Sequence, residues 1–448
     1  MPHTRQLNKA KIKENMQALM ETVHRNTDGF HHSTPVIVVE STKDHGRLEV
    51  GLREFMLTAA IGGLNVLMSG RSGSGKTTFA RSFVKSIFGS DFGFLQIDAK
   101  LSESKFRDIA FSKIKEGKKL SDAVAPTNFL TAPAVILDEY NRTPEVLVNL
   151  LQGYLVNGVV TLEGGVEIRP GVQINGERYQ WKIGTVNQGM DYTGTSNIDK
   201  ASLDRFAALL PLDVFPPAER DCDKIGINSF AEPEVTEKDN ISRYLFELKL
   251  DLPHVPISPA VNKFKSYLLK KDQCYKSPDG TKLSIANFTA EFCESCHASV
   301  STNVCGSIFA PSERAVNDAL RFSQAFAMLR SYKTGSEPAV EMEDFKAVLP
   351  FVTFRKMKIL DGWVGKYSFG SEWYATNLAI NEMYSRWSKG VERLQQVLIK
   401  KAKGAEVGKN DRDLELREAQ RDPACVSIEV VKTLFNKRNE IDNDSGKE

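Results

Sequence analysis

The segment that most constrains the fold is a glycine-rich turn with an apolar run before it and an amphipathic run after it. The apolar run 65–69 predicts a buried strand, and residues 78–88 predict a helix. Between them, the chain fits G-x-x-x-x-G-K-[ST] at every fixed position with Gly70, Arg71, Ser72, Gly73, Ser74, Gly75, Lys76 and Thr77. This order predicts a phosphate-binding loop, because successive backbone N–H groups of such a turn point inward at a phosphate. Lys76 is expected to reach the β- and γ-phosphates and Thr77 to ligate Mg²⁺, with Thr78 also in the binding segment.

A second apolar run, at 134–137, ends in two carboxylates, Asp138 and Glu139. Ligands of parallel sheets bind at the carboxyl ends of the strands, so both side chains are expected beside the phosphate loop. Asp138 would hold the Mg²⁺ shell and Glu139 would polarise an attacking water. An Asp-Glu pair also occurs as an ordinary solvated strand end, but the phosphate loop favours the functional interpretation. No Asn-Lys-x-Asp guanine-reading motif is visible, which favours ATP as the nucleotide.

Five apolar runs have the composition of buried strands, at 65–69, 92–98, 134–139, 181–187 and 207–213. Helical segments lie between several of them, which predicts an α/β fold with a parallel sheet and helices on both faces. Residues 158–180 alternate polar and apolar side chains around two glycine-containing turns, which predicts one exposed β-hairpin inserted in the core.

The rest of the chain is predicted to be mainly helical. Helices are expected at 6–25, 47–61, 240–271, 312–332, 341–359 and 371–403, and a strand at 34–40. We therefore predict four regions: an N-terminal helical and strand segment (1–46), an α/β nucleotide-binding core (47–219), an α-helical lid with an insertion at 272–305 (220–358), and a helical C-terminal extension (359–448). A length of 448 residues suits such a division, since single cores rarely grow beyond about 250–300 residues.

The charge balance excludes a global field for gripping nucleic acid. Lys and Arg total 59 against 57 Asp and Glu, a formal net charge of +2, so nucleic-acid binding would need a local basic patch. No signal peptide is visible at the N-terminus, and the longest uncharged stretch, 55–70, is too short and too broken to span a bilayer. These features predict a cytoplasmic protein without a membrane segment.

Several segments resemble motifs of MoxR-type AAA+ ATPases and follow one another in the order of that family. Residues 138–143 are similar to its Asp-Glu-x-Asn-Arg stretch, and 185–188 resemble its sensor-1 strand. Residues 201–206 look like its Leu-Asp-Arg-Phe segment, and 310–315 resemble its Ser-Pro-Arg-Ala lid motif, here with the order Pro-Ser-Glu-Arg. Residues 340–348 resemble the closing segment of the lid. The resemblance covers about residues 47–219 and 240–356.

This resemblance implies an AAA+ P-loop core of five parallel strands followed by an α-helical lid. It also implies Mg²⁺-dependent ATP hydrolysis, with Asn187 at the sensor-1 position orienting the lytic water. Arg205 would reach the nucleotide of the neighbouring subunit, and Arg314 would be the sensor-2 arginine. The other interpretations are a surface Arg205 paired with Asp204 and an Arg314 that begins a helix beside Glu313. Arg142 could face a subunit interface or form a structural salt bridge.

The partners implied by the resemblance are copies of the chain itself and a protein client. The family forms homo-hexameric rings with a chaperone-like action and often works with a von Willebrand factor A domain protein. An alternative is the ATPase motor of a nucleic-acid-processing assembly of the restriction or phage type. The mixed charge of residues 158–180 does not favour it, and the basic run at 263–271 has the pattern of a solvated helix face. A third hypothesis is a scaffold that binds nucleotide without hydrolysing it, but the intact Lys76 and Glu139 argue against it.

Four cysteines crowd into the insertion and are candidate ligands of a structural Zn²⁺, namely Cys274, Cys293, Cys296 and Cys305. The C-x-x-C pair with two further thiols meets the needs of a tetrahedral zinc site, but the remote spacings are uneven and free thiols are the alternative. Cys222 and Cys425 are expected to be ordinary, partly buried residues. Aromatic side chains concentrate at 363–374, where packing against the lid is preferred over a dedicated partner-binding element.

Overall fold

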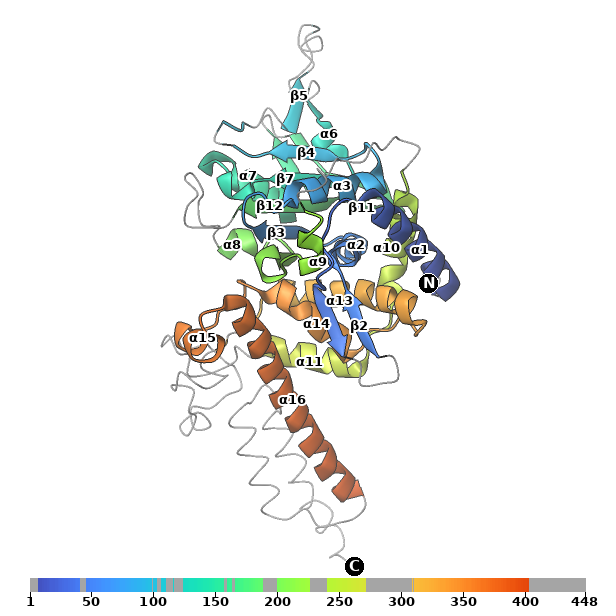
Figure 1. Ribbon diagram of the computed structural model, residues 1–448, viewed down its shortest axis with the longest axis vertical. Helices are drawn as coiled ribbons and strands as arrows, with labels where there is room; N and C mark the ends of the chain where they lie inside the picture. Colours follow the sequence, from blue (N-terminus) through green and yellow to red (C-terminus); the bar gives the residue numbers. More distant parts are fainter. Residues whose placement is uncertain are drawn as a thin grey trace, which may run out of the picture. The chain divides into compact units, whose positions relative to one another are not determined.

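A five-stranded parallel sheet forms the centre of the α/β core. The computed structural model describes residues 7–40, 46–98, 100–102, 106–109, 116, 124–156, 159–162, 166–187, 200–225, 240–270, 308 and 310–402. The strands are β3 (Val66–Gly70), β4 (Gly93–Gln96), β7 (Ala134–Asp138), β12 (Trp181–Asn187) and β13 (Ala208–Pro211). They lie in the order β13-β3-β12-β7-β4, and every pairing is parallel (Figure 1). The predicted α/β fold, with its five parallel strands and flanking helices, is confirmed.

The register of the sheet brings the polar strand ends to one edge. Asn187 at the end of β12 pairs with Gly70 at the end of β3, and Gln96 of β4 pairs with Asp138 of β7. Every residue of β3, β7 and β13 is buried, as expected for parallel strands covered on both faces. The polar residues at the ends of these strands therefore lie along one edge of the sheet.

Helices α3 (Lys76–Phe88) and α7 (Glu145–Val156) cover opposite faces of this sheet. The ring of Phe83 on α3 lies 5.8 Å from that of Trp181 on β12. The next residue of the strand, Lys182, places its Nζ 4.8 Å from the centroid of the Tyr154 ring on α7. Since successive side chains of a strand point to opposite faces, the two helices sandwich β12. On the α3 side, α1 (Lys9–Asn26) contacts α3 and α10 (Ser242–Asp251).

The predicted helix 47–61 is partly wrong, because its first residues form a strand. β2 (Arg47–Val50) pairs antiparallel with β1 (Ile37–Glu40), and the helix α2 (Leu52–Gly62) begins only after Gly51. Residues 47–50 alternate exposed and buried side chains, which is a strand period and not a helical one.

The region predicted as one hairpin contains two. β8 (Val160–Leu162) pairs with β9 (Val166–Ile168), and β10 (Val172–Ile174) pairs with β11 (Glu177–Tyr179). Pro170 and Gly171 separate the two hairpins, since proline cannot donate to a ladder. A further hairpin joins β5 (Arg107–Ile109) and β6 (Val124–Pro126). The short elements of the core are α6 (Asn128–Thr131), η2 (Tyr140–Arg142), α8 (Lys200–Leu203), η4 (Leu212–Val214) and α9 (Glu219–Cys222).

The predicted helix 240–271 is divided by prolines. It consists of α10, the short η6 (Leu252–His254) and α11 (Pro259–Lys270), with Pro253, Pro256 and Pro259 between or at the start of the pieces. The helices that follow are α13 (Glu313–Thr334), α14 (Met342–Thr353), α15 (Asp361–Ser368) and α16 (Glu372–Ala402). Three of them match predicted helices, and α15 was not predicted. Among the described helices, none combines the length and the hydropathy that a bilayer-spanning segment requires.

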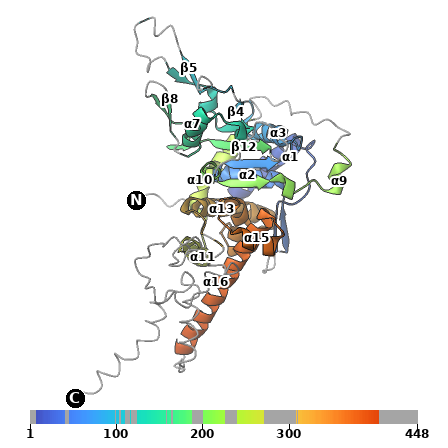
Figure 2. The ribbon, with the colours of Figure 1, turned by 90° about the vertical axis from the view of Figure 1, so that its left-hand side faces the viewer.

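The chain divides into two compact units. The first comprises Met1–Ser258 and Asn317–Val352, and the second comprises Pro259–Val316 and Thr353–Glu448. In the second unit the Phe264 ring of α11 lies 5.5 Å from the ring of Tyr384 and 5.1 Å from that of Trp387 on α16. Figure 2 shows α16 as one uninterrupted helix. Trp373 packs on Phe354 at 5.2 Å, whereas Phe369 is 95% exposed, so only part of the aromatic cluster is core. The four-region division stays a prediction.

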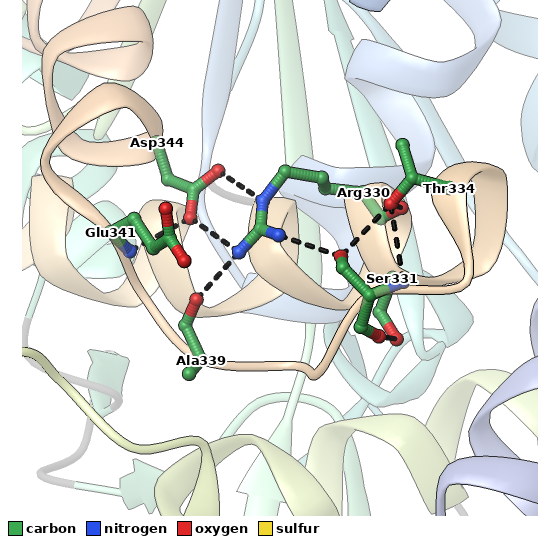
Figure 3. Close-up of polar contacts among 7 residues, drawn as sticks. Arg330, Ser331, Thr334, Ala339, Glu341 and Asp344 are labelled. Atoms are coloured by element: carbon green, nitrogen blue, oxygen red, sulfur yellow. Dashed lines mark hydrogen bonds and ion pairs between the residues drawn. The ribbon is translucent and has the colours of Figure 1, made fainter. Parts of the chain in front are cut away.

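A buried ion pair fixes the turn between α13 and α14 in the first unit. Arg330 Nε donates to Asp344 Oδ1 at 2.8 Å and Arg330 Nη2 to Asp344 Oδ2 at 3.1 Å (Figure 3). The same guanidinium donates to Ser336 Oγ and to Ala339 O, both at 2.7 Å. Asp344 also accepts from the Glu341 backbone N–H and so caps α14. Every branch of the guanidinium thus has an acceptor, which is the condition under which a buried charge is tolerated.

Candidate functional site

The phosphate loop runs from the carboxyl end of β3 to the first turn of α3. Gly73 and Gly75 both have φ +77°, in the left-handed region that side chains disfavour. A Cβ on Gly75 would lie 2.9 Å from Cε2 of Phe30, so a side chain would also collide with that ring. Lys76, Thr77 and Thr78 are the first residues of α3, where backbone N–H groups lack helical partners. The first turn of α3 therefore presents N–H groups without helical partners, where an anion can bind.

Lys76 is buried and folded back on this loop. Its Nζ donates to Gly70 O at 2.9 Å, to Arg71 O at 2.7 Å and to Ser74 Oγ at 3.2 Å. Burial lowers the pKa of Lys76, an effect opposed by the nearby carboxylates of Asp213, Asp138 and Glu139. The ammonium thus lies over the loop with acceptors that phosphate oxygens could replace.

Asp138, at the end of β7, is joined to the phosphate loop by a short hydrogen bond. Thr77 Oγ1 donates to Asp138 Oδ1 at 2.6 Å, and the aspartate is 8% exposed. A hydroxyl and a carboxylate side by side are the hard oxygen donors that Mg²⁺ takes in nucleotide sites. The two residues predicted as metal ligands therefore lie together, and their chemistry fits Mg²⁺.

Glu139 leaves the strand with a backbone turned away from β geometry. Its φ is +55° and its ψ is +46°, an unusual conformation for a residue with a side chain. Its carboxylate receives a hydrogen bond from Asn187 Nδ2 to Oε1 at 3.2 Å, and Arg142 Nε lies 3.3 Å from Oε2. Asn141 Nδ2 in turn donates to Asn187 O at 3.2 Å. The predicted water-polarising and water-orienting residues are thus in contact, and Arg142 forms a salt bridge within the chain.

Two residues of the site were not singled out from the sequence. Thr185 on β12 donates to Asp138 Oδ1 at 2.6 Å and accepts from the Glu139 N–H at 3.1 Å. Asp213, which follows β13, accepts from the Arg71 N–H at 3.1 Å. A hydroxyl two positions before Asn187 on a buried strand was a usable signal for Thr185. Asp213 carried none, because its place beside the loop depends on β13 lying next to β3.

Arg205 lies in the turn between α8 and β13. Its backbone N–H donates to Ser202 O at 3.2 Å, and its neighbour Phe206 packs edge-on against Tyr140 at 5.1 Å. Since Tyr140 follows Glu139 directly, the Arg205 segment is fixed beside the carboxylates. Within the described ranges, Arg205 Nη1 is buried and has no hydrogen-bond partner. Both interpretations of Arg205, as a surface residue paired with Asp204 and as a residue that reaches a neighbouring subunit, stay predictions.

Arg314 is the second residue of α13 and falls in the second unit. Its approach to the phosphate loop stays a prediction.

The candidate zinc ligands Cys274, Cys293, Cys296 and Cys305 lie outside the described residues, as does Cys425. The described residues contain no group of three or more His, Cys, Asp or Glu side chains that could hold a metal ion. Zinc at the cysteine cluster therefore has no structural support and stays a prediction. Cys222 is exposed, so the expectation of partial burial was wrong for it.

Comparison with known proteins identifies the segment that carries this site. Residues 65–206 match the model of the AAA domain of the dynein-related subfamily. The segment contains the phosphate loop, Asp138, Glu139, Asn187 and Arg205, whereas Arg314 lies beyond it. The crystal structure of a candidate ATPase from Cytophaga hutchinsonii is similar over 84% of this chain and 95% of its own, with a TM-score of 0.55 and 15% identity. No curated protein sequence matches the chain. The segment 65–206 is therefore similar to an AAA domain, and the core has the AAA+ P-loop fold.

Proposed function

We propose that this protein hydrolyses ATP to ADP and phosphate in a Mg²⁺-dependent reaction and uses the free energy to remodel a protein client, as MoxR-like AAA+ ATPases do. The observation that carries the proposal is the contact between Glu139 and Asn187 at 3.2 Å beside the hydrogen bond between Thr77 and Asp138 at 2.6 Å. These contacts support the proposal because they bring together the residues proposed as general base, water-orienting amide and metal ligands at the edge of the sheet where the phosphate loop begins.

Each residue has a role that its position supports. The loop N–H groups and Lys76 hold the β- and γ-phosphates and neutralise their charge. Bound Mg²⁺ would supply further charge neutralisation, held by Thr77 and through Asp138. Glu139 takes the proton of the attacking water, and Asn187 orients that water. Phosphoryl transfer depends on positioning and charge neutralisation more than on covalent catalysis, and this constellation provides both.

Phosphate release by the purified chain tests the ATPase part of the proposal. Wild-type protein is expected to release phosphate from ATP only with Mg²⁺, and Lys76→Ala is expected to abolish release. Lys85→Ala is the matched control, since this lysine lies in the last turn of the same helix. Hydrolysis by Lys76→Ala at the wild-type rate would overturn the proposed site.

We further propose that the chain works as a ring, as the hexameric MoxR-like proteins do, in which Arg205 acts on the nucleotide of the next subunit. Within the described residues, the buried Nη1 of Arg205 has no hydrogen-bond partner. This supports the proposal, because a cation that acts on a neighbour's phosphate needs no partner in its own chain. Arg205→Ala and Lys76→Ala are each expected to be inactive alone and to recover activity when mixed. In a mixed ring, Lys76→Ala subunits lend Arg205 to the intact sites of the other variant. Mixed assemblies, verified by light scattering, that stay inactive would refute the role in trans.

We propose that the client is a protein and not a nucleic acid. A von Willebrand factor A domain protein is one such client. No observation within the described residues favours the nucleic-acid motor. The substitution Glu139→Gln should trap ATP and the client together. Mass spectrometry and absorbance of the co-purifying material distinguish the two classes, and recovery of nucleic acid alone would overturn the client proposal.

A further inference from the structure

A single hydroxyl, that of Thr185, joins the two carboxylate-bearing residues of the site. Thr185 lies on the central strand β12 and is 2% exposed. Its Oγ1 is 2.6 Å from Asp138 Oδ1 and 3.1 Å from the Glu139 backbone nitrogen. It therefore contacts the aspartate through its side chain and the glutamate through its main chain.

The direction of both hydrogen bonds is fixed by chemistry. An ionised carboxylate only accepts, so the hydroxyl proton of Thr185 points to Asp138. A backbone N–H only donates, so a lone pair of the same oxygen faces Glu139. Among the natural side chains, Ser can make the same pair of bonds from this position, whereas the isosteric Val can make neither.

The second hydrogen bond, from the Glu139 N–H to Thr185, lies just beyond the last paired residues of β12 and β7. The parallel ladder between β12 and β7 runs from Trp181 opposite Ala134 to Gly184 opposite Leu137. Asp138 ends β7, and Glu139 turns into the left-handed region at φ +55°. The Glu139 N–H has thus left the ladder, and the Thr185 hydroxyl is its acceptor. Without it, a partly buried donor would be unpaired at the residue whose unusual backbone aims the carboxylate proposed as the general base.

The first hydrogen bond, from Thr185 to Asp138, helps to fix the orientation of the aspartate carboxylate. Asp138 Oδ1 accepts from Thr77 and from Thr185, both at 2.6 Å. Two donors on one oxygen fix the plane of the carboxylate relative to the phosphate loop. They leave Oδ2 as the oxygen with no hydrogen bond in the part of the chain that the structure describes.

We propose that Thr185 is a positioning residue of the hydrolytic site, which holds Asp138 in the orientation for the metal shell and the Glu139 backbone in the orientation for the general base. This rests on the proposed ATPase function and extends it to a residue that acts through Asp138 and Glu139. One hydroxyl then links metal binding to water activation, so removing it should impair both together.

The test compares Thr185→Val with Thr185→Ser in the full chain. The measurements are kcat and KM for ATP hydrolysis, and the affinity for ADP by calorimetry with and without Mg²⁺. Thr185→Val is expected to lower kcat roughly 10–100-fold and to reduce the Mg²⁺-dependent gain in ADP affinity, the usual size of effect for residues that orient a metal ligand. ADP affinity without Mg²⁺ should be unchanged, and Thr185→Ser should recover most of both losses.

Thr58→Val is the matched control, because Thr58 is also fully buried and its hydroxyl donates to Glu54 O at 2.7 Å within α2. It should leave all four quantities unchanged. Wild-type kcat and Mg²⁺ dependence in Thr185→Val would overturn the proposal. Equal losses in the Val and Ser variants would also overturn it, since they would indicate a packing role. If the wild-type chain released no phosphate, the ATPase proposal would fail. The Mg²⁺-dependent ADP affinities of the variants would still test whether Thr185 positions Asp138.

Discussion

The side-chain amide of Asn187 donates to Oε1 of Glu139 at 3.2 Å, which links the carboxyl ends of β12 and β7. An amide in this place can orient a water for the carboxylate without taking the proton itself. Asn187→Ala is therefore expected to lower kcat for ATP hydrolysis roughly 10–100-fold, near the lower range for general acid–base catalysis. The affinity for ATP should change little, because no loop contact is lost. Steady-state kinetics together with nucleotide-binding titrations check this, and Asn262→Ala on an exposed face of α11 is the control. A large loss of ATP affinity with unchanged kcat would assign Asn187 to binding.

Gly75 is constrained both by its backbone and by its neighbour Phe30. Gly75→Ala places a side chain at φ +77° and brings Cβ to 2.9 Å from Phe30 Cε2. The backbone strain alone costs about 1–2 kcal/mol. We expect at least a tenfold loss of ATP affinity, measured by fluorescent-nucleotide titration, and partial recovery in the double variant with Phe30→Ala.

Gly176→Ala is the control that carries backbone strain without a steric clash at the added Cβ. Gly176 has φ +88°, but a Cβ there would meet no atom within 4 Å, and it lies in the turn between β10 and β11. It should lose stability and keep nucleotide affinity. Equal nucleotide affinities for Gly75→Ala and wild-type protein would contradict the account of the loop.

Lys182 is a buried cation in the central strand of the sheet. Burial lowers its pKa to about 8 from an ordinary value of 10.5. Between these two values the unfolded chain binds more protons than the folded one, so stability should rise with pH by up to about 1.4 kcal/mol per pH unit. At pH 7 the penalty is present in full, which predicts that Lys182→Met raises the free energy of unfolding.

The predicted gain of Lys182→Met is roughly 1–3 kcal/mol at pH 7, because the lost cation–π contact with Tyr154 offsets part of the relief. The advantage over wild type should shrink by pH 9.5. Burial also raises the pKa values of Tyr154 and Tyr179, but these groups are present in both proteins and cancel in the comparison. Urea unfolding at the two pH values provides the measurement. An advantage that is absent at pH 7, or that grows with pH, would be inconsistent with a charged, desolvated Lys182.

Removing one partner of the Arg330–Asp344 ion pair should destabilise the protein strongly, whereas replacing both with apolar residues should destabilise it much less. The side chain of Asp344 is fully buried and that of Arg330 is 11% exposed, so Asp344→Ala would leave a buried cation without its partner. Losing one partner of such a pair costs about 3–5 kcal/mol. The double variant Arg330→Met with Asp344→Leu should lose much less. Glu382→Ala, which removes an exposed pair with Arg386, should change stability by less than about 1 kcal/mol. Thermal unfolding of the four proteins gives the comparison, and equal losses in Asp344→Ala and Glu382→Ala would disprove the ranking.

The phosphate loop and the five strands could be predicted because each is encoded locally. Val66–Gly70 and Ala134–Asp138 are short apolar runs that end in glycine or carboxylate, which is the signature of buried parallel strands. Asn187 was assigned through its resemblance to a sensor-1 strand, and the structure brings it to Glu139. Prediction from local pattern failed where one segment allowed two periods, as in residues 47–50, and where prolines interrupt a helical pattern, as between α10 and α11.

The parts of the site that escaped prediction depend on contacts between distant segments. Thr185 reaches Asp138 because β12 lies next to β7, although 47 residues separate the two side chains. Asp213 reaches Arg71 across 142 residues for the equivalent reason. The strand order that creates both contacts is a property of the folded sheet and has no local signature in either segment.

The most direct test of the central claim is the ratio of ATP binding to ATP turnover in Glu139→Gln. The substitution keeps the size of the side chain and removes its ability to accept a proton, while the loop, Lys76 and the contact between Thr77 and Asp138 are untouched. The account predicts Mg²⁺-dependent ATP affinity within about threefold of wild type and phosphate release lowered at least about 100-fold. Phosphate release by Glu139→Gln at a rate close to that of wild type would contradict the assignment of this edge of the sheet as the hydrolytic site.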